Sequence, residues 1–157
     1  MIEIERKFLV LSDGYKKEAY RSTMIVQGFL NTHKKRTVRV RVRGEQGYLT
    51  VKGVSSLDGT SRFEWEKDIS KTDAEALLNL CEPGIIKKIR YEVKEGNHVY
   101  EVDEFHDDNL GLVIAEIELN DTLESFEKPK WLGEEVTGDL RYYNSQLSKN
   151  PYAQWVK

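Results

Sequence analysis

The sequence has 157 residues, close to one typical domain, and its 24 Lys and Arg against 27 Asp and Glu give a net charge of −3. This balance argues against general nucleic-acid binding, and no apolar run approaches the roughly 20 residues of a membrane span. The charged start M-I-E-I-E-R-K lacks the apolar region of a secretory signal, and the single Cys81 excludes an internal disulfide and a Cys-rich zinc site. We therefore expect one domain over residues 1–157 in a reducing cytoplasm.

Most of the chain alternates between apolar and polar residues with period two, which is typical of β-strands. The sequence predicts about eight strands: Ile2–Val10, Met24–Asn31, Thr37–Arg43, Tyr48–Val54, Arg62–Ile69, Ile85–Lys94, His98–Phe105 and Val113–Asn120. Gly44–Gly47 and Glu95–Asn97 have the composition of tight hairpin turns. Eight antiparallel strands with few long crossovers predict a mostly β fold, α+β overall, built on one large sheet that is curled or closed.

Helices are expected in three places. The first is a short helix near Asp13–Tyr20. The second begins at a capping pattern, Ser70–Asp73, and ends at Pro83-Gly84, with an apolar stripe at Ala74, Leu77, Leu78 and Cys81. From Leu123 onward the chain is expected to be helical with interruptions, and Thr137–Asp139 is expected to open a last helix carrying Leu140, Tyr143 and Leu147.

Nearly every predicted strand carries charges along one face. The charged sets are Glu3, Glu5 and Lys7; Arg39, Arg41 and Arg43; Lys52; Arg62, Glu64, Glu66 and Asp68; Lys88 and Arg90; Glu101 and Asp103; Glu116 and Glu118. A solvated sheet face would account for any one strand. The strand centres are, however, almost purely ionic, and three arginines in a row repel one another unless an anion lies among them.

The two kinds of charge suit a metal–polyphosphate complex. Carboxylates two residues apart on a strand lie roughly 7 Å apart on one face, which suits oxygen ligation of a hard cation. Guanidinium groups offer forked donors for phosphate oxygens. If the apolar faces point outward under helices, these charges line the inside of a barrel.

The same residues, in the same order, resemble the CYTH superfamily, also called triphosphate tunnel metalloenzymes. The hallmark E-x-E-x-K is present as Glu3–Lys7. It is followed by Arg39-Val40-Arg41, Lys52, Glu64-Trp65-Glu66, Lys88-Ile89-Arg90 and Glu116-Ile117-Glu118. Gln27–Leu30, Thr137–Asp139 and Arg141–Asn144 also resemble segments of bacterial members. Of the adjacent Lys87 and Lys88, spacing favours Lys88 as the inward-facing one.

The resemblance implies a closed eight-stranded antiparallel β-barrel that forms a polar tunnel, with flanking helices outside and a C-terminal helix near one mouth. Family members hydrolyse inorganic triphosphate, nucleoside triphosphates or thiamine triphosphate, and some cyclise ATP to cyclic AMP. All use divalent metals, usually Mg²⁺ or Mn²⁺. The expected partner is a small-molecule triphosphate, without nucleic acid or membrane, and the chain is expected to be a monomer or a homodimer.

The resemblance also suggests roles for individual residues. The phosphate chain is expected to be held by Lys7, Arg39, Arg41, Lys52, Lys88 and Arg90. The metal is expected to be held by Glu3, Glu5, Glu116 and Glu118, and Glu5, Lys7 and Glu116 are expected to be closest to the chemistry. Supporting roles fall to Glu64, Glu66 and Asp103, the first two by pairing with the arginines.

Inorganic triphosphate is the favoured substrate, because strand aromatics fall mostly outward and no inward pair can sandwich a base or a thiamine ring. The alternatives are an adenylate cyclase, a nucleoside or thiamine triphosphatase, and a non-enzymatic polyphosphate-binding module. His33, His98 and His106 lack metal-ligand spacing. Trp65 and Tyr100 are expected to pack outward under helices, whereas Trp131 and Trp155 receive no role.

Overall fold

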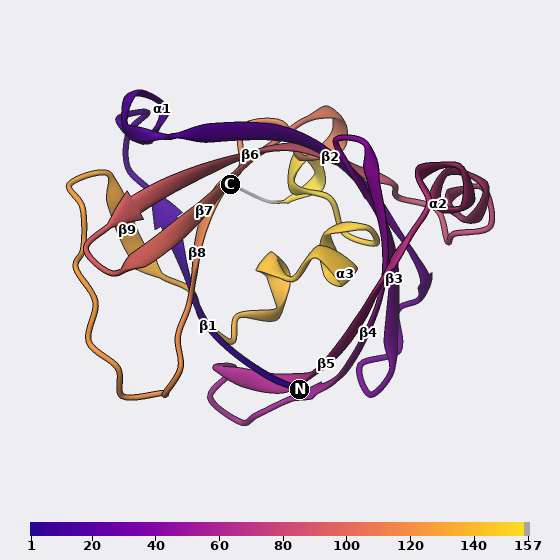
Figure 1. Ribbon diagram of the computed structural model, residues 1–157, viewed down its shortest axis with the longest axis horizontal. Coiled ribbons are helices and arrows are strands. Elements are labelled where there is room, and N and C mark those ends of the chain that lie inside the picture. Colours follow the sequence, from indigo (N-terminus) through magenta and orange to yellow (C-terminus); the bar gives the residue numbers. More distant parts are fainter. Residues whose placement is uncertain (156–157) are drawn as a thin grey trace.

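The computed structural model describes residues 1–155 and contains nine strands and several short helices (Figure 1). The strands are β1 (Ile2–Val10), β2 (Arg21–Asn31), β3 (Thr37–Arg43), β4 (Gln46–Ser55), β5 (Ser61–Ile69), β6 (Ile86–Glu95), β7 (His98–Phe105), β8 (Val113–Glu118) and β9 (Leu132–Glu135). The helices are α1 (Tyr15–Glu18), α2 (Lys71–Leu78) and α3 (Asn144–Leu147), with 3₁₀ turns at Asp107–Asn109, Leu140–Tyr142 and Tyr152–Gln154. None of these helices has both the length and the apolar character needed to cross a membrane.

The first eight strands close into an antiparallel barrel in the order β5-β4-β3-β2-β6-β7-β8-β1. The closing strand is β1, which pairs along its whole second half with β8. Its other edge is divided: Ile2 and Glu3 pair with β5, whereas Phe8 and Val10 pair with β9. The predicted closed eight-stranded barrel is therefore confirmed, and β9 is an addition that the sequence did not predict.

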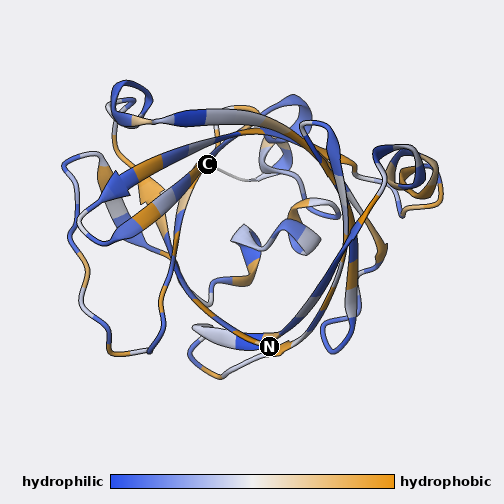
Figure 2. Ribbon diagram, viewed as in Figure 1, coloured by the Kyte–Doolittle hydropathy of each residue, from blue (hydrophilic) through white to orange (hydrophobic). Residues whose placement is uncertain are grey.

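Figure 2 shows the predicted alternation of hydrophilic and hydrophobic residues along the strands. Outside the barrel, α2 packs on β3 and β4, where Val40, Val42 and Ala74 are buried. The predicted cap of α2 is confirmed, because the Ser70 hydroxyl accepts a hydrogen bond from the Asp73 amide at 3.0 Å. Such a cap satisfies one of the orphan amides at a helix N-terminus.

A second outer core forms around Trp131, which has only 2% of its surface exposed. Its ring packs edge-on against Tyr15 of α1 and Tyr100 of β7, and its Nε1 donates to Glu18 at 3.1 Å. Trp131, unassigned from the sequence, thus covers the outer face of the barrel. Trp65 is different: 37% of its surface is exposed, so the expected packing under a helix is at most partial there.

The predicted helical C-terminus is largely wrong. Residues 123–131 have no regular helix, β9 follows, and the expected last helix is broken into the turn Leu140–Tyr142 and the four-residue α3. Asp139 caps the first of these by accepting from the Arg141 amide at 3.1 Å. In Figure 1 this segment, drawn in yellow, lies within the ring of strands rather than beside it.

The C-terminal segment packs on an apolar layer inside one end of the barrel. Cross-strand partners share a face, so the pairing of Phe29 with Arg39, Phe105 with Lys88 and Ile114 with Asp103 places these apolar side chains inside together with the charges. The buried set comprises Phe29, Ile86, Phe105, Leu112, Ile114, Val136, Tyr142 and Leu147. We call this set the apolar plug. The expectation that apolar strand residues point outward is therefore wrong at this end.

Two glycines let the backbone of the segment approach the barrel closely. Gly84 has φ +99°, and a Cβ there would lie 1.9 Å from the Ser148 carbonyl oxygen. Gly59 has φ +77°, and a Cβ there would lie 2.3 Å from the Cα of Gly138. Both positions demand glycine for conformation and for space. The segment is thereby fixed at two separate points around the rim.

The plug predicts a strong dependence of stability on Leu147, which has 1% of its surface exposed. Leu147→Ala should lower the free energy of unfolding by about 2–5 kcal/mol, because the cavity left behind cannot close fully. Leu140→Ala is the matched control, because Leu140 is 63% exposed and should change stability by less than about 0.5 kcal/mol. Urea unfolding measures both, and equal effects would contradict the plug.

Candidate active site

Inside the barrel, beside the apolar plug, lies a cavity of about 270 Å³. Charged side chains from seven of the eight barrel strands line it. The cations are Lys7, Arg39, Arg41, Arg43, Lys52, Arg62, Lys88 and Arg90, and the carboxylates are Glu3, Glu5, Glu64, Glu66, Glu101, Glu116 and Glu118. All six predicted phosphate-binding residues and all four predicted metal ligands are among them.

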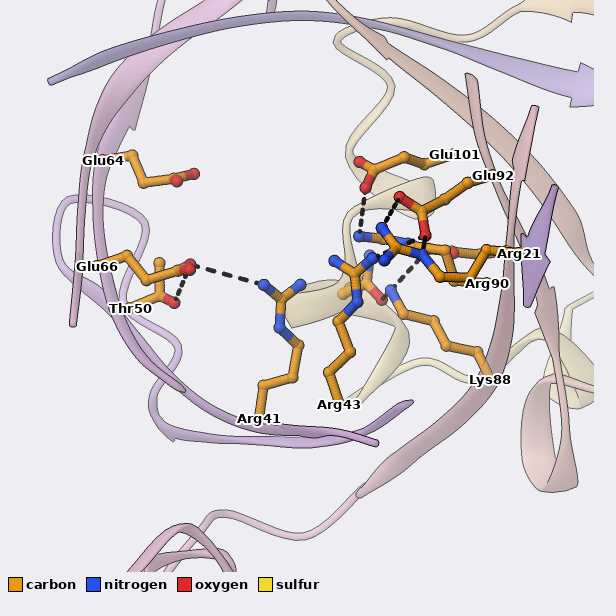
Figure 3. Close-up of polar contacts among 12 residues, drawn as sticks. Arg21, Arg41, Arg43, Thr50, Glu64, Glu66, Lys88, Arg90, Glu92 and Glu101 are labelled. Atoms are coloured by element: carbon orange, nitrogen blue, oxygen red, sulfur yellow. Dashed lines mark hydrogen bonds and ion pairs between the residues drawn. The ribbon is translucent and has the colours of Figure 1, made fainter. Parts of the chain in front are cut away.

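Arg41 and Arg43 of β3 point into the barrel (Figure 3). Arg41 shares a carboxylate with Arg39 of the same strand, whereas Arg43 contacts Glu92 at 3.0 Å. Glu66 lies 3.5 Å from Arg39 and 3.6 Å from Arg41, and it accepts a hydrogen bond from Thr50 at 2.9 Å. Burial and the neighbouring charges of Arg39 and Arg90 lower the pKa of Arg41 to about 9. The buried Nε atoms of Arg39 and Arg41 have no hydrogen-bond partner among the described residues. The two guanidinium groups are therefore only partly compensated by the protein.

A second cationic group lies on β6, around Asp103 of β7. Arg90 donates two hydrogen bonds to Asp103, each at 2.8 Å, and the Lys88 ammonium lies 2.8 Å from the same carboxylate. Burial lowers the pKa of Lys88 to about 8, although Asp103 opposes the change. Lys88 is 1% exposed whereas Lys87 faces solvent, which confirms the predicted choice between them. Asp103 thus contacts the cations, as a supporting residue would.

Lys52 of β4 contacts carboxylates on two other strands. It lies 3.0 Å from Glu3 of β1 and 3.2 Å from Glu64 of β5. Burial raises the pKa of Glu3 against the pull of Lys52, and the shared contact with Glu64 adds to the rise. Glu66 therefore contacts arginines, as expected, whereas Glu64 contacts Lys52 instead of an arginine.

Three glutamates on β1 and β8 have no ion-pair partner among residues 1–155: Glu5, Glu116 and Glu118. Burial, followed by the charges of Glu116 and Glu3, raises the pKa of Glu5 well above its usual range. Burial would also raise the pKa of Glu116, but Lys7, a hydrogen bond with Glu5 and the charge of Arg90 lower it. Glu5 and Glu116 thus form one hydrogen-bonded pair in which the pKa of Glu5 is raised and that of Glu116 is lowered.

Glu118 belongs to the same acidic group at its more exposed end. Partial burial, with the charges of Glu101, Glu3 and Glu64, raises its pKa to about 7. Carboxylates that are close enough to raise one another's pKa repel one another when charged. A bound cation would stabilise their charged forms.

The donor set fits a divalent cation that is shared with a ligand. No group of three or more carboxylate, imidazole or thiol side chains is gathered as a metal cage within the part of the chain that the structure describes. Mg²⁺ commonly uses only one or two protein carboxylates and takes its other ligands from phosphate oxygens and water. Glu5 and Glu116, hydrogen-bonded to each other and without a cation, can supply that contribution.

The C-terminal segment supplies site residues that sequence reasoning missed. The Lys7 ammonium donates to the Tyr142 carbonyl at 3.3 Å and lies 4.9 Å from the centre of the Tyr143 ring. Tyr143 and Asn144 both line the cavity. Their short turns carry no periodic signal. Arg62 and Glu101 also line the cavity. The sequence could have indicated both, because Arg62 shares a strand face with Glu64 and Glu101 shares one with Asp103.

Aromatic lining is limited to Phe29 and Tyr143. Phe29 is 4% exposed and belongs to the apolar plug. Tyr143 is placed between Lys7 and Arg62, whose guanidinium lies 5.9 Å from the ring centre, and its hydroxyl lies 3.1 Å from Ser55 Oγ. Neither ring is part of an aromatic pair that could enclose a heterocycle.

Comparisons with known proteins agree with this geometry. A family model described as the CYTH domain matches residues 1–150. A curated relative from Acetivibrio thermocellus, named inorganic triphosphatase, is 50% identical over 151 residues, covering 96% of this chain and 95% of the relative. Another of the same name, from Nitrosomonas europaea, is 36% identical over 154 residues, covering 94% and 97%. The crystal structure of an inorganic triphosphatase matches with a TM-score of 0.64 and 33% identity, covering 93% of each chain.

We expect the buried arginines to lower the free energy of unfolding of the ligand-free protein. Arg41→Met should raise the free energy of unfolding by about 1–3 kcal/mol, because it removes a poorly compensated charge from the interior and leaves Glu66 beside Arg39. Arg36→Met, at an exposed turn position, should leave stability nearly unchanged. Thermal unfolding without added anions or metals compares the variants, and a clearly less stable Arg41→Met protein would contradict the prediction.

Proposed function

This chain belongs to the CYTH domain family, and we propose that it hydrolyses inorganic triphosphate to pyrophosphate and phosphate with a divalent cation. Both curated relatives described above are named inorganic triphosphatase. The observation that carries the proposal is the near balance of eight cationic and seven carboxylate side chains around one cavity. A bare polyanion would meet as much repulsion as attraction in this cavity. An anion that brings its own cation suits both groups of side chains, because the anion contacts the cationic ones and the cation contacts the carboxylates.

The phosphate chain would lie along the cationic strands. Its oxygens would accept charge-assisted hydrogen bonds, each stronger than a neutral one. The donors are Lys7, Arg39, Arg41, Lys52, Lys88 and Arg90, as the sequence predicted. Glu66 and Asp103 hold four of these groups in place. Less side-chain conformational entropy is therefore lost when the phosphate chain binds.

Glu5 and Glu116 would hold the cation, with Glu3 and Glu118 beside them, and Mg²⁺ or Mn²⁺ are the ions that such hard oxygen ligands favour. A cation bound there supplies charge neutralisation and lowers the pKa of a water molecule. Lys7 is next to both the acidic group and the C-terminal segment. It pairs across the strands with Glu116, and its ammonium donates to the Tyr142 carbonyl. Glu5, Lys7 and Glu116 are therefore the residues we place nearest to the reacting atoms.

Hydrolysis requires a water molecule to attack the terminal phosphorus in line with the bridging oxygen that leaves. One P–O bond forms as the bridging P–O bond breaks, and the products are phosphate and pyrophosphate. Arg90 and Lys88, each bound to Asp103, would stabilise negative charge that develops on the leaving pyrophosphate. Positioning and electrostatics carry the reaction, so no strong side-chain base is needed.

The cavity favours inorganic triphosphate over its organic esters. The apolar plug and the C-terminal segment occupy one end of the barrel, and neither Phe29 nor Tyr143 offers a paired surface for a base. A nucleoside would add little binding while displacing one charged phosphate end from the cations.

Steady-state kinetics tests this choice. We expect kcat/KM for inorganic triphosphate to exceed that for ATP by at least about tenfold, equal to about 1.4 kcal/mol of transition-state preference. Pyrophosphate should be a poor substrate because it spans fewer cations. Phosphate and pyrophosphate release is measured with each substrate in Mg²⁺. An equal or higher value for ATP would overturn the choice, and cyclic AMP among the products would indicate a cyclase.

The cation assignment is tested separately. Glu116→Gln keeps the side-chain shape but removes a ligand charge, so kcat should fall by on the order of 10²-fold or more. Glu134→Gln is the control, because Glu134 is an exposed residue of β9 outside the cavity. Turnover of inorganic triphosphate is measured against Mg²⁺ and Mn²⁺ concentration for both variants. Unchanged turnover and cation dependence in Glu116→Gln would remove Glu116 from the metal site.

A further inference from the structure

Asn144, the first residue of α3, contacts the cavity through its side-chain oxygen. Its Oδ1 accepts a hydrogen bond from the Lys88 ammonium at 3.0 Å and another from the Gln27 amide at 2.9 Å. The orientation of the Asn144 amide follows from chemistry, because an ammonium group can only donate and the atom facing it must be oxygen. Gln27 is fully buried on β2, so the second bond holds Asn144 against the barrel wall.

These contacts determine where the Lys88 ammonium can donate. The group has three N–H donors. One is directed at Asp103 at 2.8 Å and one at Asn144 at 3.0 Å. Because the ammonium is tetrahedral, two fixed acceptors also fix the direction of the third donor. No hydrogen-bond acceptor among residues 1–155 faces that donor: the neighbours of the ammonium are the Phe105 ring, whose centre lies 5.3 Å away, and the cavity that Lys88 lines.

Asn144 is held by the rigid part of the C-terminal segment. Three residues further on, Leu147 is buried in the apolar plug, and Ser148 packs closely on Gly84. Its preceding residue, Tyr143, contacts Lys7, Arg62 and Ser55. A polar group fixed on both sides by packing can impose its geometry on a neighbour, which a group on a loose loop cannot.

Without Asn144, Asp103 would be the one hydrogen-bond acceptor left to the Lys88 ammonium among residues 1–155, and the ammonium could turn about that contact. Asp103 also accepts two hydrogen bonds from Arg90, so it cannot set the direction of Lys88 alone. We propose that Asn144 is a positioning residue, which as a second fixed acceptor stops the Lys88 ammonium from turning about its contact with Asp103 and directs its third donor at a phosphate oxygen of inorganic triphosphate. This role rests on the proposed function of the cavity.

A double-mutant cycle tests whether Asn144 acts through Lys88. The proteins are wild type, Asn144→Ala, Lys88→Ala and the double variant, and Asn150→Ala is the control from the exposed end of the same segment. Calorimetric titration with inorganic triphosphate in Ca²⁺, a hard cation that takes oxygen ligands and here replaces Mg²⁺, gives dissociation constants, and a phosphate assay on the same samples checks that no turnover occurs. Each single variant should bind about tenfold more weakly, and the double variant should bind no more than about twofold more weakly than Lys88→Ala.

Kinetics with Mg²⁺ supplies a second readout. Asn144→Ala should raise KM by a similar factor, and Asn144→Val, which fills the space but offers no acceptor, should do the same. Ligand-free melting temperatures identify any variant that has lost its fold. Effects that add fully in the double variant would show that Asn144 acts independently of Lys88, and unchanged binding in both Asn144 variants would also overturn the proposal. If the wild type binds no triphosphate, the proposed function fails first and this role fails with it.

Discussion

The gathering of fifteen charged side chains around one cavity, with Lys7, Arg41, Lys88 and Arg90 buried, is the constraint on which the rest of the structure depends. A buried charge without a partner costs several kcal/mol, so each must find a counter-charge or a hydrogen bond. A closed barrel helps, because side chains from neighbouring strands and from across the interior can supply one. Glu66 of β5 contacts Arg39 and Arg41 across β4, and Asp103 of β7 contacts Lys88 and Arg90 of the neighbouring β6. Glu5 and Glu116 form no ion pair among residues 1–155 and are hydrogen-bonded to each other.

The apolar plug gives these charges their strength. Phe29, Phe105 and Ile114 face inward and pair across the strands with Arg39, Lys88 and Asp103, so the charged part of the barrel lies directly beside an apolar part. Exclusion of water from one end lowers the local dielectric and strengthens each ion pair and each bond to a ligand. The plug needs the C-terminal segment for its completion. That segment therefore has two functions: it seals the barrel with Tyr142 and Leu147, and it contacts Lys7 and Lys88 with polar groups.

Much of this could be predicted from the sequence, for a physical reason. Period-two alternation is a local property, and it identified the eight barrel strands and the charged faces of β1, β3, β6 and β8 correctly. Alternation cannot show where along a barrel the inward face becomes apolar, because Phe29 and Ile114 have the same local pattern as outward residues. The turns around Asn144 have no period at all, and their conformation depends on tertiary contacts with residues distant in sequence, such as Gly59, Gly84 and Gln27.

Stability and binding make opposite demands on the same side chains. Burial and cationic neighbours disfavour the charge of Arg41 and lower its pKa, and burial and acidic neighbours disfavour the charge of Glu5 and raise its pKa. Either charge could be replaced by an apolar group at a gain in folding free energy. A bound polyphosphate and its cation would reverse both penalties at once, since the anion compensates Arg41 and the cation compensates Glu5. The unfavourable electrostatic energy of the ligand-free barrel thus contributes to the free energy of binding. The full contribution requires a ligand that carries both signs of charge.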